Sequence, residues 1–148
     1  MLVTGQAAGP VWPSASPPQA ASLLAWELHD VVQLASVRAE LRGHAVTGAG
    51  SDPETADVHD RLVLALDEMA SNALRHGGGR VHASVGQTPD AFLIDVSDQA
   101  PEVAPTPAVD RDPSEGGLGL YLIAELAIEH GWYVRGGAKH VWALLPRT

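Results

Sequence analysis

Residues 66–77 carry a row of polar side chains on a helical spacing and read Leu66-Asp67-Glu68-Met69-Ala70-Ser71-Asn72-Ala73-Leu74-Arg75-His76-Gly77. Apolar residues recur here at the i, i+3/i+4 spacing of a helix with one buried face, at Leu62, Leu66, Met69 and Ala73. Glu68, Asn72 and His76 are spaced by four, so each is rotated by only about 40° from the last around the helix axis. The segment predicts an amphipathic helix that ends at Gly77, with a carboxylate, an amide and an imidazole along the edge of its apolar face.

A glycine-rich stretch further along the chain precedes a largely apolar run of helical length. This stretch is Gly116-Gly117-Leu118-Gly119. Backbone N–H groups at a helix N-terminus attract anions, and glycines allow a phosphate to approach without a Cβ in the way. Glycine is also common at ordinary turns, so this stretch alone is weak evidence for phosphate binding. The polar row that precedes it in the chain strengthens that evidence. The two signals together, in this order, predict a phosphate-binding helix start.

The rest of the chain predicts an alternation of strands and helices. Strands are expected at 22–28, 80–85 and 92–98, and a final hairpin pairs 133–135 with 141–144. Helices are expected at 31–44, at 53–76 and from Leu118 onward. Trp132 and Trp142 are expected to face each other across the hairpin. The expected fold class is α+β: a two-layer α/β sandwich with a mainly antiparallel sheet and helices on one face.

These motifs resemble the GHKL (HATPase) ATP-binding domain, the Bergerat fold, and in particular the small anti-sigma-factor serine/threonine kinases. The family's first motif, Glu-x-x-x-Asn often followed by Arg-His-Gly, matches Glu68, Asn72 and His76. Its second motif, an Asp that closes a hydrophobic strand, matches Asp98. The third, a Gly-x-Gly helix start, matches residues 117–119. The resemblance covers roughly residues 20–146 of the chain.

The resemblance implies a Mg²⁺-ATP site in which each motif has a role. Asn72 would coordinate Mg²⁺, and Glu68 would be the catalytic residue that accepts a proton from an attacking hydroxyl. His76 would join the cofactor-binding residues, and Asp98 would accept a hydrogen bond from the exocyclic amine of adenine. The phosphates would be bound by Gly116, Gly117, Leu118 and Gly119.

The function that the resemblance implies is a kinase that phosphorylates an anti-anti-sigma partner and sequesters a sigma factor, either as a monomer or as a homodimer. Two positions depart from the family pattern: Ala100 stands where a glycine is usual, and His140 where a threonine is usual. Both favour an alternative, a non-catalytic regulatory domain of the same fold with weak or lost nucleotide binding. A histidine-kinase catalytic domain would need a preceding dimerisation helix, and residues 1–19 have no helical period.

Composition excludes several other classes of protein. The chain has 148 residues and a net charge of −9 with no basic cluster, which argues against nucleic acid as a partner. It has no cysteine, so disulfides and thiolate metal sites are excluded. No apolar run approaches the roughly 18 residues of a membrane span, and no signal-peptide pattern is present. No membrane association and a cytoplasmic location are therefore expected.

Proline content divides the chain into a tail and a domain. Residues 1–19 hold four prolines among Ala, Gly and Ser, which predicts a disordered tail. Residues 20–148 are expected to form a single ATP-binding domain. Within it, residues 99–115 hold four further prolines and correspond by position to the ATP lid of the family. Arg111 is the only Lys or Arg in that stretch.

Overall fold

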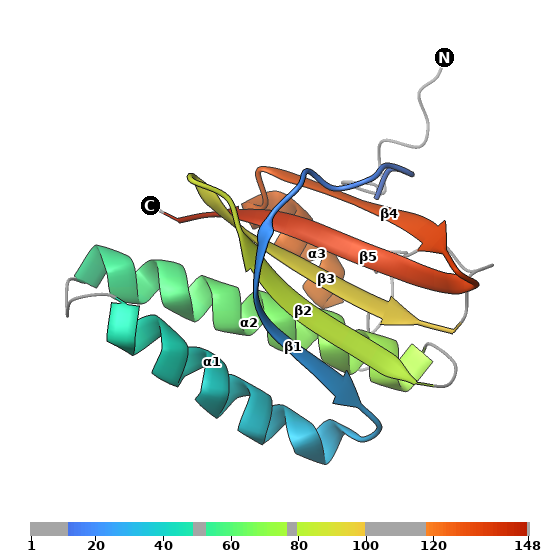
Figure 1. Cartoon of the computed structure of the whole chain (residues 1–148), viewed down its shortest axis with the longest axis horizontal. Coiled ribbons are helices and arrows are strands. Elements are labelled where there is room, and N and C mark those ends of the chain that lie inside the picture. The colour runs from blue at the N-terminus through green and yellow to red at the C-terminus, as the bar shows by residue number, and fades with distance from the viewer. Residues whose placement is uncertain (1–11, 49–52, 77–79, 100–117, 148) are drawn as a thin grey trace.

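The computed structural model describes residues 12–48, 53–76, 80–99 and 118–147 (Figure 1). In chain order these residues form β1 (Ala21–Leu28), the 3₁₀ helix η2 (Val31–Gln33), α1 (Leu34–Gly48), α2 (Pro53–His76), β2 (Val81–Gln87), β3 (Ala91–Asp98), α3 (Leu118–Leu126), β4 (Glu129–Arg135) and β5 (Ala138–Pro146). Every strand and helix expected from the sequence is present, with its ends displaced by a few residues at most. Within the described ranges, no helix combines the length and the apolar composition needed to cross a lipid bilayer.

The five strands form one sheet in the order β1-β2-β3-β5-β4, and each neighbouring pair is antiparallel. Alternate residues of a strand face the core: in β2, Val81, Ala83 and Val85 are buried, whereas His82 is exposed. Figure 1 shows α1, α2 and α3 together on one face of this sheet. The α+β two-layer architecture expected from the sequence is therefore confirmed.

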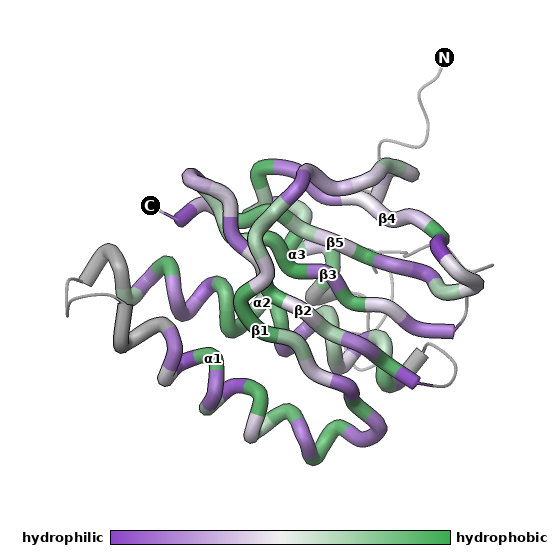
Figure 2. Tube along the Cα trace, in the orientation of Figure 1, coloured by the Kyte–Doolittle hydropathy of each residue, from purple (hydrophilic) through white to green (hydrophobic). Residues whose placement is uncertain are grey.

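Helix α2 supplies the centre of the core. Its predicted apolar positions are all buried: Leu62, Leu66, Met69 and Ala73. Hydrophobic and hydrophilic residues also alternate along α1 (Figure 2), whose buried positions are Leu34, Val37 and Leu41. α2 lies against α1, α3, β2 and β3. Each large apolar side chain buried here contributes about 1.5–3 kcal/mol relative to an exposed one, which explains why the helical period was a reliable signal.

The helix expected from residue 31 begins with a single 3₁₀ turn, which Asp30 and Gln33 cap reciprocally. The carboxylate of Asp30 accepts a hydrogen bond from the backbone N–H of Val32 at 2.9 Å. The side-chain oxygen of Gln33 accepts from the backbone N–H groups of Asp30 and His29, at 3.0 and 2.6 Å. This capping box satisfies N–H groups that a helix start leaves without partners. It also fixes the orientation of the Gln33 amide.

The hairpin between β4 and β5 turns at Gly136 and Gly137, whose φ angles are +59° and +80°. Glycine adopts this left-handed backbone without a steric penalty, as the predicted hairpin requires. The expectation that Trp132 and Trp142 face each other is wrong. Trp132 pairs with Val141, and Trp142 pairs with Gly131. Because neighbouring register positions point to opposite sides of a sheet, the two indoles lie on different faces.

The tail predicted for residues 1–19 is wrong for residues 12–19, which lie against the domain; residues 1–11 lie outside the described ranges. Trp12 is 5% exposed and belongs to the main core. The backbone N–H of Trp132 donates to the carbonyl of Pro13 at 3.0 Å, and that of Ala15 donates to the carbonyl of Trp132 at 2.9 Å. Proline composition misled the prediction because a proline carbonyl still accepts hydrogen bonds and one tryptophan buries a large apolar area.

Residues 12–19 then cross the sheet face opposite the helices, from the edge of β4 to the start of β1 (Figure 1). On that face the indole N–H of Trp142 donates to the carbonyl of Ala15 at 2.8 Å. Gly131 permits this approach, because a Cβ at its position would lie 2.9 Å from the carbonyl oxygen of Pro13 and 3.0 Å from the Trp142 ring. The domain therefore begins at least eight residues earlier than the predicted boundary at residue 20.

Candidate functional site

Two polar side chains on the C-terminal half of α2 have no partner in the described protein. Glu68 and Asn72 are half-buried, one helical turn apart, and lie next to the buried Met69 and Ala73. Among the described residues, neither the carboxylate of Glu68 nor the amide of Asn72 makes a hydrogen bond or ion pair. Neither side chain belongs to the fully buried polar groups without a partner, so water reaches both of them and a ligand can take the place of that water. His76 is the last residue of α2.

Asp98 closes β3, as predicted, and its side chain is 4% exposed. It lies on the helix-covered face, which it shares with the core residues Ile94 and Val96. Its carboxylate is 3.6 Å from Nζ of Lys139, whose side chain is 9% exposed. A buried charge is tolerated when an opposite charge accompanies it, and Lys139 supplies that charge. Lys139 belongs to none of the sequence motifs and was not predicted as a site residue.

His140 does not lie beside Asp98, which corrects the expectation that it replaces a threonine of the adenine site. It points to the opposite face of the sheet, where its Nδ1 is 2.8 Å from Oδ1 of Asp95. The hydroxyl of Tyr133 donates to Oδ2 of the same carboxylate at 2.7 Å and its ring stacks on the imidazole. Burial and the Asp95 carboxylate raise the pKa of the Tyr133 hydroxyl. Side-chain alternation along β5 explains this error, since adjacent residues cannot share a face.

The sheet register brings the predicted site residues to one end of the molecule. Ser97 lies opposite both His82, near the start of β2, and His140, near the start of β5. Since α2 ends just before β2 begins, the C-terminal end of α2 lies at this same end (Figure 1). α3 packs against α2 and begins at Leu118, where the glycine stretch predicted a helix start. Gly119 is its second residue.

Part of the predicted site cannot be placed. Gly116 and Gly117 lie outside the described residues, as do Ala100, Arg111 and nearly all of the predicted lid at 99–115. The described donors suit a magnesium nucleotide by their chemistry. The Asn72 amide oxygen is a ligand type that Mg²⁺ accepts, Asp98 can accept a hydrogen bond from an amine, and the start of α3 attracts anions. The residues present therefore fit the group that the motifs predict.

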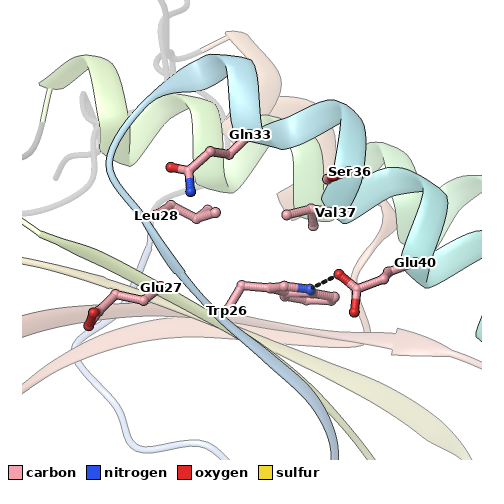
Figure 3. Close-up of a pocket in the computed structure, with 7 residues that line it drawn as sticks. All are labelled: Trp26, Glu27, Leu28, Gln33, Ser36, Val37 and Glu40. Atoms are coloured by element: carbon pink, nitrogen blue, oxygen red, sulfur yellow. Dashed lines mark hydrogen bonds between the residues drawn. The ribbon is translucent and has the colours of Figure 1, made fainter.

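A separate pocket of about 280 Å³ lies between β1 and α1 and contains none of the predicted site residues (Figure 3). Its lining consists of Trp26, Glu27, Leu28, Gln33, Ser36, Val37 and Glu40. This pocket was not predicted from the sequence, because its residues come from β1, η2 and α1, which share no motif.

Comparison with known proteins supports the motif assignment. A family model described as a histidine kinase-like ATPase domain matches residues 29–144. The match contains α2, β3, α3, β4 and most of β5, and so every predicted site residue. No curated protein matches the chain.

Proposed function

The chain belongs to the histidine kinase-like ATPase domain family, and on that premise we propose that it is a Mg²⁺-ATP-binding regulatory protein with serine/threonine kinase activity. The observation that carries this proposal is the state of Glu68 and Asn72. Both are half-buried on α2, at the end of the molecule where β3 closes with Asp98, and neither has a protein partner among the described residues. An acceptor and an amide that the protein leaves unpaired at a half-buried position suit contacts with a bound ligand.

Each of the three motif residues has a proposed role that follows from the chemistry of its side chain. Asn72 would hold Mg²⁺ through its carbonyl oxygen without adding a buried charge. Glu68 would accept the proton of a serine or threonine hydroxyl on a bound partner. Asp98 would accept a hydrogen bond from the exocyclic amine of adenine, which favours ATP over GTP. Bound Mg²⁺-ATP would supply the phosphoryl group.

The partners proposed are an anti-anti-sigma protein as phospho-acceptor and a sigma factor as the sequestered protein. Support for these partners comes from the resemblance of the motifs to the small anti-sigma-factor kinases. The net charge of −9 is consistent with a protein partner and disfavours direct contact with nucleic acid. The oligomeric state is proposed to be monomer or homodimer, as in the small members of the family.

One structural observation favours a second candidate, a regulatory domain that binds a partner but not nucleotide. The Asp98 carboxylate already has a cation, Lys139, at 3.6 Å. An adenine amine would have to share this carboxylate with Lys139. The hydrogen bond between the adenine amine and Asp98 would therefore be weaker. His140, which favoured this candidate on sequence grounds, lies on the other face of the sheet and no longer bears on it.

Calorimetric titration with Mg²⁺-ATP and Mg²⁺-GTP tests the proposal. We expect saturable ATP binding that Asn72→Ala abolishes and that the control Asp60→Asn, on the exposed side of α2, preserves. Glu68→Gln should still bind ATP but lower the rate of ADP formation by about 10²–10⁴-fold, as loss of a general base does. Absence of binding at millimolar ATP would reject the kinase and leave the second candidate.

A further inference from the structure

The pocket between β1 and α1 has the chemistry of a site for a basic side chain. We propose that it binds a lysine or arginine carried by an extended segment of a partner protein, which pairs with the free edge of β1. The proposal does not depend on nucleotide binding, because the pocket shares no residue with the predicted nucleotide site.

The acceptor in the pocket is the carboxylate of Glu40. Its Oε2 accepts a hydrogen bond from the indole Nε1 of Trp26 at 2.9 Å, which joins α1 to β1 across the pocket (Figure 3). Among the described residues no cation pairs with Glu40. A carboxylate held by a neutral donor keeps its full charge and still has free lone pairs, so it can accept from an ammonium or a guanidinium.

The walls of the pocket suit the stem of such a side chain. Leu28 and Val37 are 2% and 3% exposed and form an apolar floor, and the half-buried Trp26 adds an aromatic ring. Lysine and arginine bury their methylene stems on surfaces of this kind, and a cation near an indole gains a further attraction. The Gln33 side-chain oxygen is held by two backbone N–H groups, so its NH₂ group is left to face the pocket (Figure 3). That donor can meet a carbonyl of the bound segment.

The edge of the sheet beside the pocket is unpaired. β1 is the terminal strand of the sheet and pairs only with β2 in the described structure. The opposite edge, at β4, is already occupied by the segment around Ser14. An unpaired edge accepts an added strand, whose side chains then alternate between the two faces of the sheet. Trp26 faces the helices, since it pairs with the buried Ala83, so a helix-facing residue of the added strand would reach the pocket.

Charge complementarity favours a basic occupant, which the proposal places on a partner molecule. The net charge of −9 attracts basic segments, and the pocket itself carries the carboxylate of Glu40. Residues 1–11 of this chain contain no Lys or Arg, so this segment cannot supply a basic side chain to the pocket.

The proposal is tested by NMR titration of the ¹⁵N-labelled full chain with the blocked pentapeptide Thr-Val-Arg-Val-Thr and its norleucine analogue. With the arginine peptide we expect saturable shifts of the Trp26 indole N–H and of the backbone amides of β1. Norleucine in place of arginine, or Glu40→Gln, should weaken binding by about tenfold. Glu27→Gln is the matched control, because the Glu27 side chain points away from the pocket (Figure 3) and its loss should leave binding unchanged.

Three results would overturn the proposal. Equal shifts with both peptides would show that the pocket does not recognise the positive charge. Shifts of the Trp26 indole N–H without shifts of the β1 backbone amides would reject strand addition. A dimer of the free protein that dissociates on Glu40→Gln, without any peptide shift, would assign the pocket to a second copy of the chain. The spectrum of each variant reports in the same experiment whether it is folded.

Discussion

The carboxylate of Asp98 and the ammonium of Lys139 lie opposite each other across the β3–β5 pair, 3.6 Å apart and both more than nine-tenths buried. This pair places a full positive charge next to the residue predicted to select adenine. It also stands at the end of the molecule that carries Glu68 and Asn72. The electrostatics of the predicted nucleotide site are therefore set by a residue that the family motifs do not include.

We predict that removing only one charge of the Asp98–Lys139 pair lowers the stability of the fold. Lys139→Met removes the cation that lies 3.6 Å from the buried Asp98 carboxylate and should lower the free energy of unfolding by about 3–5 kcal/mol. The double variant Asp98→Asn/Lys139→Met removes both charges and should recover most of that loss. Urea unfolding measures both. Arg80→Met is the control, because the exposed Arg80–Glu27 pair has the same 3.6 Å separation and should cost at most about 1 kcal/mol. Equal losses in the two Met variants would contradict this account.

The family's threonine should matter at position 139 and not at position 140. His140→Thr breaks the contact with Asp95 on the opposite face, so it should lower stability but leave ATP affinity unchanged. Lys139→Thr removes the competing cation from Asp98 and supplies a hydroxyl on the correct face, so it should tighten ATP binding. Calorimetry with both variants decides the point, and the reverse pattern would restore the assignment based on sequence alone.

Local periodicity made the core and half of the candidate site predictable. On α2, the residues at i, i+3 and i+4 are buried and Glu68 and Asn72 lie at the edge of that face, as the spacing requires. The strand that ends at Asp98 was predictable for the same reason, because the residue pattern of a strand is local. Alternation places Lys139 on the same face as Val141 and His140 on the face of Trp142, but residues 141–145 are all apolar and buried, so the sequence did not show which face meets the helices.

Non-local contacts account for what the sequence could not show. Residues 12–19 have no periodic pattern of apolar residues, and contacts with a distant part of the chain hold them in place. Trp12 packs against His130, and the carbonyl of Pro13 accepts a hydrogen bond from the backbone N–H of Trp132. The pocket at Trp26 and Glu40 likewise joins residues fourteen positions apart on two elements. No pattern within a single segment records such contacts, because they exist only once the sheet and helices have assembled.

Trp12 is predicted to anchor the N-terminal segment. Trp12→Ala should lower the free energy of unfolding by about 3–5 kcal/mol, as truncations of buried aromatic residues do. Trp12→Phe should cost less, because it keeps most of the buried ring and removes an indole N–H that has no hydrogen-bond partner in the described protein. Urea unfolding followed by far-ultraviolet circular dichroism measures both. If Trp12→Ala were no more costly than the exposed control Gln19→Ala, the segment would not contribute to stability.

His130 should make stability depend on pH in mildly acidic solution. Burial lowers its pKa below the ordinary value of 6.5, so the unfolded chain takes up a proton at a pH where the folded chain does not. Its contribution to the free energy of unfolding is therefore complete above pH 6.5 and falls as the pH drops from there toward the folded pKa. Between pH 7.5 and about 5.5, the wild type should lose more stability than His130→Gln, as measured by urea unfolding at each pH. Trp12→Phe keeps an aromatic ring over the imidazole and should retain the wild-type slope, whereas Trp12→Ala exposes the imidazole and should reduce it. A slope unchanged in His130→Gln would mean that other groups control the acid response.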